Sequence, residues 1–306
     1  MRPIVKVLVP VGLMLAAGCG ATTTVTATPG PPRAVGLAYA KSNAAVAETF
    51  DRIDTALQRI PAIGIAARVD HAANATSVGM TLRPTRVILF GNPTLGTPLM
   101  QRNQAAGIDL PQPIVVYENA GGEVFAGYNT TDYLSSRHGL DGVATLAMLA
   151  SGLKGVVENA TAATVRPPEP TIVPSGAGLL IRQSRFSVDE TFARLTSAVM
   201  ANPAIRFVTE VDHAAAAARA GLSLRPTRLL VFDNARLGTP LLQSRQRIGI
   251  DLPQRVLVWQ DATGAVNLAY NDPAYLANRH GIQDRTQEIQ MIAAGLAALA
   301  QQSTTP

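Results

Sequence analysis

Blocks of hydrophobic and polar residues follow one another along the second half of the chain and predict its strands and helices. Residues 177–186, AGLLIRQSRF, carry an apolar run that is typical of a strand. Ser187 and Glu190 then form a capping box, which predicts an amphipathic helix that runs to about Ala201. Residues 205–212, IRFVTEVD, predict the next strand.

The rest of this half continues the mixture of strands and helices. Asp212 is placed to cap a short alanine-rich helix, which Gly221 ends. The further elements expected are this helix at 213–220, a strand at 228–233, a hairpin at 255–270 with its turn at 261–264, and a last helix at about 284–300. Because strands and helices do not alternate strictly, the order favours an α+β fold with one helix-covered sheet.

The first half of the chain repeats this pattern at a constant offset, with position 70 matching position 212. The register holds without a gap from Asp70-His71 and Asp212-His213 to Arg137-His138-Gly139 and Arg279-His280-Gly281. A repeat of this length indicates a tandem duplication of one domain and not a solenoid of short units. We therefore expect two copies of a small two-layer domain that pack together as a pseudo-dimer.

Composition sets the boundaries of the two copies. Residues 161–176, TAATVRPPEPTIVPSG, are rich in proline and have no partner in the first copy, so they are predicted to be a linker. The expected organisation is a signal at 1–19, a tether at 20–33, a first domain at 34–160, the linker, a second domain at 177–300 and a tail at 301–306.

The start of the chain has the anatomy of an export signal. Arg2 and Lys6 precede an apolar run over 7–17, and the following Gly-Cys is similar to the end of a bacterial lipobox, with Cys19 as the lipidated residue. The Thr, Pro and Gly residues at 20–33 predict a flexible tether. These features predict a protein of the bacterial cell envelope, held to a membrane by a lipid anchor; a plain signal peptide with an incidental cysteine is the alternative.

Composition argues against several classes of protein. Hydrophobic residues make up 47% of the chain and charged residues 15%, which is typical of compact domains and not of a disordered chain. The formal net charge is +5, but no run of Lys or Arg stands outside the export signal, and aromatic residues make up only 5%. These features argue against nucleic acid as a partner.

A phrase of eleven residues occurs in both copies, as FGNPTLGTPLM and FDNARLGTPLL. The first version predicts that Asn92 ends a strand and that Gly96 takes a left-handed conformation. Thr97 and Pro98 are then suited to begin a helix over 99–106. The counterparts in the second copy are Asn234, Gly238 and Thr239. The alternative interpretation is that the free amides of this turn hold an anionic group of a ligand.

The chain contains four histidines, which form two equivalent pairs, His71 with His138 and His213 with His280. The carboxylates that accompany them in the repeated motifs belong to Asp70, Asp109, Asp212 and Asp251. If the fold brings the set of one copy together, it is suited to hold a metal ion or to perform acid–base chemistry. The structural alternative is that the histidines flank helix starts or bond to carbonyl groups near helix ends, and that Asp109 and Asp251 form turns.

The ordered motifs of each copy resemble the family called domain of unknown function 302. They are Asp-His before an alanine-rich helix, LRPT before an apolar strand, F-x-N-x-x-x-G-T-P-L, GIDLP, a hairpin ending in YN, and YL-x-x-RHG. The resemblance implies a two-layer α+β domain related to the TATA-binding-protein-like fold and often paired as a dimer, and it implies no activity. The family's FGNP is present at 90–93 but reads FDNA at 232–235. If Gly91 and Pro93 contribute to a site, the second copy has lost part of it, and the two halves are no longer equivalent.

The function expected from these features is binding rather than catalysis. Cys19 is the only cysteine, and no Ser stands in a Gly-x-Ser-x-Gly elbow, so the sequence offers no evident nucleophile. We expect an envelope-anchored lipoprotein that binds a small ligand or an envelope partner at an inter-domain or histidine-lined surface. The alternative is a metal-binding protein or an acid–base enzyme that uses the duplicated Asp-His and Arg-His-Gly positions. The sequence specifies no cofactor.

Overall fold

Each copy of the repeat forms one five-stranded antiparallel sheet in the computed structural model, which describes residues 33–168 and 172–306. The strands of the first copy are β1 (Leu37–Ser42), β2 (Gly64–Asp70), β3 (Thr85–Gly91), β4 (Gln112–Glu118) and β5 (Val124–Asn129). Those of the second are β6 (Leu179–Ser184), β7 (Arg206–Asp212), β8 (Thr227–Asp233), β9 (Gln254–Gln260) and β10 (Val266–Asn271). Both sheets have the same order, β1-β5-β4-β3-β2 and β6-β10-β9-β8-β7.

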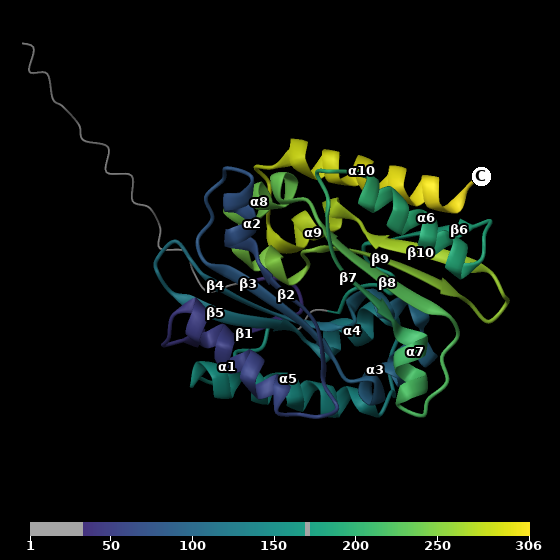
Figure 1. The fold of residues 1–306 in the computed structure, drawn as a ribbon. Coiled ribbons are helices and arrows are strands. Elements are labelled where there is room, and N and C mark those ends of the chain that lie inside the picture. The colour runs from purple at the N-terminus through teal and green to yellow at the C-terminus, as the bar shows by residue number, and fades with distance from the viewer. Residues whose placement is uncertain (1–32, 169–171) are drawn as a thin grey trace, which may run out of the picture.

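Helices cover one face of each sheet. The first copy has α1 (Val46–Gln58), α2 (His71–Ser77), α3 (Pro93–Arg102), the 3-10 helix η1 (Gln104–Asp109), α4 (Thr131–His138) and α5 (Thr145–Thr161). The second has α6 (Val188–Ala201), α7 (His213–Arg219), α8 (Ala235–Ser244), η2 (Gln246–Ile250), α9 (Pro273–His280) and α10 (Thr286–Thr304). Figure 1 shows α1 and α5 on one outer side, α6 and α10 on the other, and both sheets between them. The predicted α+β fold with two helix-covered sheets is confirmed.

Each copy buries a core of its own under its outer helices. In α1, Phe50, Ile53 and Leu57 recur at helical spacing on one face and are buried. They belong to one cluster with Ile88 and Val116 on neighbouring strands of the sheet. The second copy repeats this arrangement with the equivalent residues of α6, so the duplication extends to the packing.

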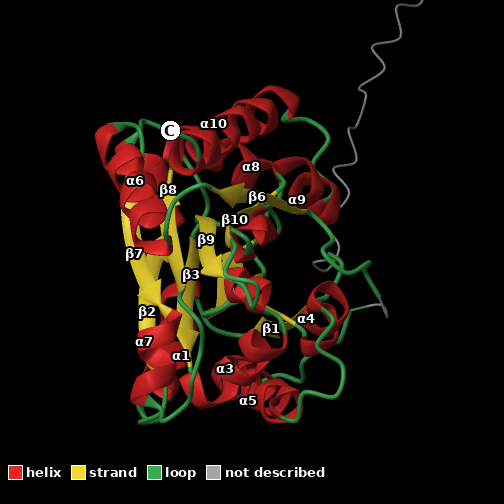
Figure 2. Cartoon of the chain, turned by 90° about the vertical axis from the view of Figure 1, so that its right-hand side faces the viewer, coloured by secondary structure: helices red, strands yellow, loops and turns green. Residues whose placement is uncertain are grey.

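The two sheets pack against each other through the faces that the outer helices leave free. Leu89 and Ile108 of the first copy share a cluster with Leu229, Leu257 and Trp259 of the second. The 3-10 helix η1 contacts β8 and β9, while η2 contacts β3 and β4, so each copy places the same segment against its partner. Figure 2 shows the two halves stacked in this way, with α6 and α10 above and α1 and α5 below. The copies pack as a pseudo-dimer.

Arg166, within the segment predicted to be a linker, forms a bridge to β1 at the edge of the first sheet. The main-chain N–H of Tyr39 donates to the carbonyl oxygen of Arg166 at 3.1 Å, and the N–H of Arg166 donates back at 2.7 Å. Ile181 is the counterpart of Tyr39 and has no such bridge within the described ranges. Tyr39 is 9% exposed and Ile181 is 54% exposed. The edge strand of the first sheet is therefore covered at this position, and the edge strand of the second sheet is not.

The helix in the repeated phrase begins earlier than its sequence indicated. α3 starts at Pro93, directly after Asn92, whose side chain accepts the N–H of the second helical residue. Gly96 and Thr97 lie inside the helix, and Gly96 is not left-handed. The prediction of a turn at Gly96 and a cap at Thr97 was therefore wrong. Asn92-Pro93 carries the same signal of cap and proline as Thr97-Pro98, and it comes first after the strand.

The second copy follows the same course. β8 ends at Asp233, and α8 begins directly after Asn234. The side chain of Asn234 makes no cap hydrogen bond. Residues 235–244 are helical, and this range includes Gly238 and Thr239. The helix starts at this place with alanine instead of proline, so the fold of the strand and helix, and not the proline, sets the position.

The last helix is longer than predicted. α10 ends at Thr304 instead of near Ala300, and it therefore takes up most of the tail predicted at 301–306. Ser303 and Thr304 are buried, and their hydroxyl groups donate to carbonyl groups one turn back, at 2.6 and 2.7 Å. These local bonds satisfy the polar side chains, so the helix continues after its apolar periodicity ends.

The predicted signal, the lipidation site Cys19 and the tether up to residue 32 lie outside the described residues. Within 33–168 and 172–306, no helix has the length and hydropathy needed to cross a membrane. Export and lipid anchoring stay predictions from the sequence.

Candidate functional site

Two buried ionic clusters join the copies at the centre of their interface. In the first, Asp109 Oδ2 lies 2.7 Å from both Arg137 Nη1 and His138 Nε2. Arg137 also reaches into the second copy, where Nη2 donates to Asn271 Oδ1 at 2.6 Å and Nε donates to the carbonyl of Ala177 at 2.9 Å. The side chains of the triad are almost fully buried, so this ion pair is also a contact between copies.

The second cluster repeats the first with the roles of the copies exchanged. Arg279 Nη1 donates to Asp251 at 2.8 Å, and His280 Nε2 lies 2.6 Å from Asp251 Oδ2. Arg279 reaches back into the first copy, donating to Asn129 Oδ1 at 2.6 Å and to the carbonyl of Val35 at 2.9 Å. Each copy therefore holds the other through the same set of hydrogen bonds.

The electrostatics of the clusters fit a structural role. Burial alone would raise the pKa of Asp251, but Arg279 and the hydrogen bond from His280 outweigh it and lower the pKa to about 2. The pKa of Asp109 is lowered in the same way, against the effect of burial. Both carboxylates are thus ionised at neutral pH, each beside a buried arginine. An ion pair of this kind stabilises the interface as long as both partners are present, and it is a role that neither interpretation of the sequence included.

The fold does not bring His71 together with His138. His138 bonds to Asp109 of its own copy, whereas His71 lies against the second copy beside the carbonyl group of Leu252. No three His, Cys, Asp or Glu side chains are grouped to hold a metal ion in the part of the chain that the structure describes. The metal or acid–base set that the sequence suggested is therefore divided between two separate places.

The Asp-His pairs instead lie where each copy meets its partner. Asp70 and Asp212 cap α2 and α7, accepting main-chain N–H groups at 2.9 and 2.7 Å, and the predicted cap at Asp212 is confirmed. His213 lies beside the carbonyl groups of Gly107 and Leu110 of the first copy. Burial lowers the pKa of His213 to about 4, in spite of these carbonyls, so its imidazole is neutral at neutral pH.

The main-chain amides at the start of α3 already have partners. The side chain of Asn92 accepts the N–H of Thr94 at 3.0 Å. The carbonyl of Asn92 accepts the N–H groups of Leu95 and Gly96 at 3.0 and 2.9 Å, and Pro93 has no N–H to offer. The alternative in which free amides of this turn hold an anionic group does not match this geometry.

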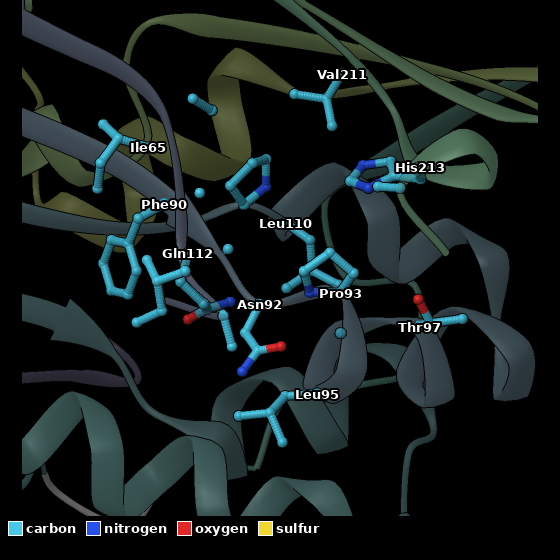
Figure 3. Close-up of a pocket in the computed structure, with 18 of the residues that line it drawn as sticks. Ile65, Phe90, Asn92, Pro93, Leu95, Thr97, Leu110, Gln112, Val211 and His213 are labelled. Carbon is cyan, nitrogen blue, oxygen red and sulfur yellow. The ribbon is translucent and has the colours of Figure 1, made fainter. Parts of the chain in front are cut away.

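A cleft of about 710 Å³ lies between the copies beside the start of α3. The first copy contributes the end of α1, β2, the β3–α3 junction and α5, and the second contributes β7 and α7. Figure 3 shows this cleft with its lining side chains. The apolar walls include Leu57, Ile65, Phe90, Leu95, Leu149 and Val211. A concave apolar surface with a few polar groups is the usual form of a small-molecule site.

Two glycines leave the cleft open. Gly64 and Gly91 stand opposite each other in the β2–β3 ladder. A Cβ added to Gly64 would meet nothing within 4 Å, and one added to Gly91 would come no closer than 3.6 Å to Pro111. In the second copy the opposite residues at these two positions are Arg206 and Asp233. The sequence therefore omits two side chains here that its own duplicate retains.

Three polar side chains at the cleft lack partners. Thr97 Oγ1, Gln112 Oε1 and His213 Nε2 are buried and make no hydrogen bond to the described residues. The amide of Gln112 is oriented by its Nε2, which donates to the carbonyl of Asp109 at 3.0 Å. Buried polar atoms usually have partners, so these three atoms are open to a further hydrogen bond. The counterpart of His213 Nε2 in the second copy, His71 Nε2, has no hydrogen-bond partner either among the described residues.

The equivalent place in the second copy is occupied by charged side chains. Asp233 is buried and accepts a hydrogen bond from Asn74 Nδ2 of the first copy at 2.9 Å. Burial lowers the pKa of His71, while the carboxylate of Asp233 acts to raise it and Arg206 acts to lower it. These four side chains form a polar group at the position where the first copy has a cleft.

Sequence reasoning found only part of this site. It singled out Thr97 and His213, and the difference between FGNP and FDNA pointed to Gly91. It missed Gly64 and Gln112, which carry no recognisable motif. A position-by-position search for glycine in one copy against a charged residue in the other would have found Gly64, because Arg206 is its counterpart.

Comparison with known families identifies both copies. The pattern of the family described as Domain of unknown function DUF302 matches residues 39–160 and 180–299. The chain belongs to the DUF302 family. The two matched ranges coincide with the two sheets and their helices, so this DUF302 protein contains the domain twice in tandem. The family description carries no activity, and the function must be argued from the site.

Curated relatives cover only part of this DUF302 protein. A protein of Brucella suis biovar 1 (strain 1330) named fluoride-specific ion channel FluC 1 is 41% identical over 140 residues, which is 46% of this chain and 54% of the relative. A protein of the same name from Brucella abortus biovar 1 (strain 9-941) matches with the same identity and 51% of its length. The chain spans about half the length of the curated relatives it matches.

A solved structure shares the family name. The crystal structure of an uncharacterized conserved DUF302 protein from Bacillus stearothermophilus is 17% identical to this chain, with a TM-score of 0.38. It covers 41% of this chain and 98% of its own.

Proposed function

We propose that this DUF302 protein is an envelope-anchored binding protein that holds a small, mainly apolar ligand in the cleft between its two copies. The observation that carries the proposal is the pair Gly64 and Gly91, which leaves an apolar cleft open at the place where the second copy has Arg206 and Asp233. Both copies contribute to the walls, so the ligand site requires the pseudo-dimer.

The buried polar atoms support the same function. Thr97 Oγ1, Gln112 Oε1 and His213 Nε2 line the cleft at separate places, and each would gain a hydrogen-bond partner from a polar group of a ligand beside it. A buried polar group without a partner reduces stability by about 1–3 kcal/mol. A bound ligand therefore stabilises the folded chain both through these bonds and through burial of apolar surface.

The proposed location is the outer side of a bacterial membrane. Its support is the signal sequence that ends at Cys19, and a lipid on that residue would hold the cleft near apolar molecules of the envelope. Substitution Cys19→Ala is expected to abolish incorporation of labelled palmitate and to release the protein from the membrane fraction. Labelled palmitate that still enters the Cys19→Ala protein would contradict the anchor.

The binding function is tested with N-phenylnaphthylamine, an uncharged apolar dye whose fluorescence increases when it leaves water. We expect saturable binding of one dye to the chain from residue 20 onward. The variant Gly91→Asp introduces the side chain that closes the equivalent place, and its Cβ fits without a clash. Binding by this variant is expected to weaken at least about tenfold.

The matched control is Gly295→Asp, the same substitution at an exposed glycine of α10 outside the cleft, where an added Cβ meets nothing within 4 Å. This variant is expected to bind the dye as the native chain does. If Gly91→Asp and the native chain bind equally well, or if the native chain does not bind, the proposed function is wrong.

A further inference from the structure

We infer that the ligand of the cleft is an uncharged amphiphile, with an apolar chain and a head group that carries a hydroxyl. The inference rests on the proposed binding function and specifies the chemistry of the molecule bound. It is drawn from the difference between the cleft and its counterpart in the second copy, together with the three buried polar atoms of the cleft.

The second copy shows what this fold requires when a carboxylate occupies the place. Asp233 is buried there, and its carboxylate accepts from Asn74 at 2.9 Å and stands opposite Arg206. In the cleft of the first copy, the counterparts of Asn74 and Arg206 are Ala216 and Gly64, and both line the cleft. A ligand carboxylate would find neither the amide nor the guanidinium there. Burial of a carboxylate without partners is strongly unfavourable.

The acidic side chains of the cleft are not arranged to receive a cation. Asp212 accepts the N–H of Ala215 at 2.7 Å as the cap of α7. Glu210 is exposed and lies 3.7 Å from Arg228 in an ion pair, and Arg219 adds a positive charge to the same wall. His213 is neutral at neutral pH, as described above. Asp212 and Glu210 therefore already have partners, and the side chain of Arg219 is exposed to water instead of buried in the cleft. This geometry favours an uncharged molecule.

The buried polar atoms define the head group. Gln112 uses its Nε2 to donate to the carbonyl of Asp109, so its free Oε1 needs a donor from the ligand. The hydroxyl of Thr97 and the neutral imidazole of His213 complete the set. A hydroxyl group of the ligand can donate to the Gln112 oxygen without carrying a charge, and the apolar walls receive the attached chain.

The test is displacement of bound N-phenylnaphthylamine at neutral pH by three molecules with the same alkyl chain: decanol, decanoate and decylamine. We expect decanol to displace the dye at a concentration at least about tenfold lower than either charged analogue. Displacement by decanoate or decylamine at the same concentration as decanol overturns the inference and leaves the proposed function standing. A native chain that binds neither dye nor decanol, as measured by calorimetry, overturns both.

A pair of variants that differ in charge at position 64 separates the effect of charge from the effect of ligand hydrophobicity. The variant Gly64→Arg installs the guanidinium of the second copy, and Gly64→Met installs a long side chain without charge. A Cβ added at Gly64 meets nothing within 4 Å, so both substitutions begin without a clash. Relative to Gly64→Met, the Gly64→Arg protein is expected to shift the ratio of decanoate to decanol affinity toward decanoate by at least about tenfold. Equal ratios in the two variants would show that charge in the cleft does not select the ligand.

Discussion

The cleft of the first copy and the equivalent place in the second copy share one backbone plan and differ in their side chains. The cleft of the first copy is apolar and open, while its counterpart in the second copy holds a buried carboxylate with its partners. Three of the positions that differ between the copies here are Gly64 against Arg206, Gly91 against Asp233, and Ala216 against Asn74. The comparison shows that the same pair of strand positions carries two glycines in one copy and a charged pair in the other. Under the proposed function, this difference decides which of the two places receives a ligand.

The two ionic clusters at the interface, in contrast, are the same in both copies. The triads Asp109, Arg137, His138 and Asp251, Arg279, His280 are identical in sequence and make the same contacts at nearly the same distances. Each arginine serves both copies, so the loss of either would open one side of the interface. Identity between the copies thus marks residues that hold them together, and divergence marks the cleft.

The largest expected effect comes from breaking one of the identical clusters. Arg137→Ala leaves Asp109 buried with a single hydrogen-bond partner, and removal of one member of a buried ion pair lowers the free energy of unfolding by about 3–5 kcal/mol. Arg279→Ala is expected to act to the same extent. Urea unfolding measures both values.

The control for these variants is Arg194→Ala, which removes an exposed ion pair with Glu190. It is expected to change the free energy of unfolding by less than about 1 kcal/mol. A loss for Arg137→Ala as small as that of Arg194→Ala would show that the cluster does not stabilise the interface.

The second effect is a dependence of stability on pH. Burial lowers the pKa of His213 to about 4 from 6.5, so the unfolded chain takes up a proton before the folded chain does as the pH falls. The contribution of His213 to the free energy of unfolding is therefore complete above pH 6.5. About 3 kcal/mol of this free energy is lost as the pH falls from 6.5 to 4. His280, with a pKa of about 4, adds a second loss of the same sign.

The variant His213→Gln removes one of these groups and is expected to flatten the curve of unfolding free energy between these pH values. Urea unfolding at a series of pH values measures the slope. An unchanged slope for His213→Gln would contradict the burial of a neutral imidazole at the open cleft.

The smallest effect on stability sharpens the comparison between the clefts themselves. The double variant Arg206→Gly, Asp233→Gly gives the second copy the two glycines of the first. Loss of the bond from Asn74 is expected to lower the free energy of unfolding by about 1 kcal/mol. We expect the number of N-phenylnaphthylamine molecules bound per chain to rise from one to two. A count that stays at one would show that other side chains of the second copy also close its cleft.

Much of the fold follows from the sequence alone. The capping box at Ser187 and the cap at Asp212 both appear in the structure, because such signals act within one turn of a helix. The start of α3 was predicted too late because two equal signals, at Asn92 and at Thr97, compete within a few residues. Local patterns give the kind of element more safely than its first residue.

The site was beyond such patterns. Gly64 and Gly91 are far apart in the sequence and become neighbours only through the register of β2 and β3. The bonds from Arg137 to Asn271 and from Asn74 to Asp233 cross between the copies, and no spacing within one copy encodes them. The sequence correctly showed that the histidines are repeated. It did not show their contacts, in which His138 meets Asp109 and His71 meets the carbonyl group of Leu252 in the other copy.

The linker at 161–176 has a consequence for how such a molecule evolves. In a dimer of identical chains, every mutation appears in both subunits, so a substitution that plugs one cavity plugs its twin as well. In a tandem duplication the two halves are encoded by separate stretches of one gene. A mutation can therefore change one half and leave the other unchanged. The covalent connection also makes assembly independent of protein concentration, since the second half is never diluted away from the first. The two halves can then diverge, so that one carries a buried carboxylate where the other keeps two glycines.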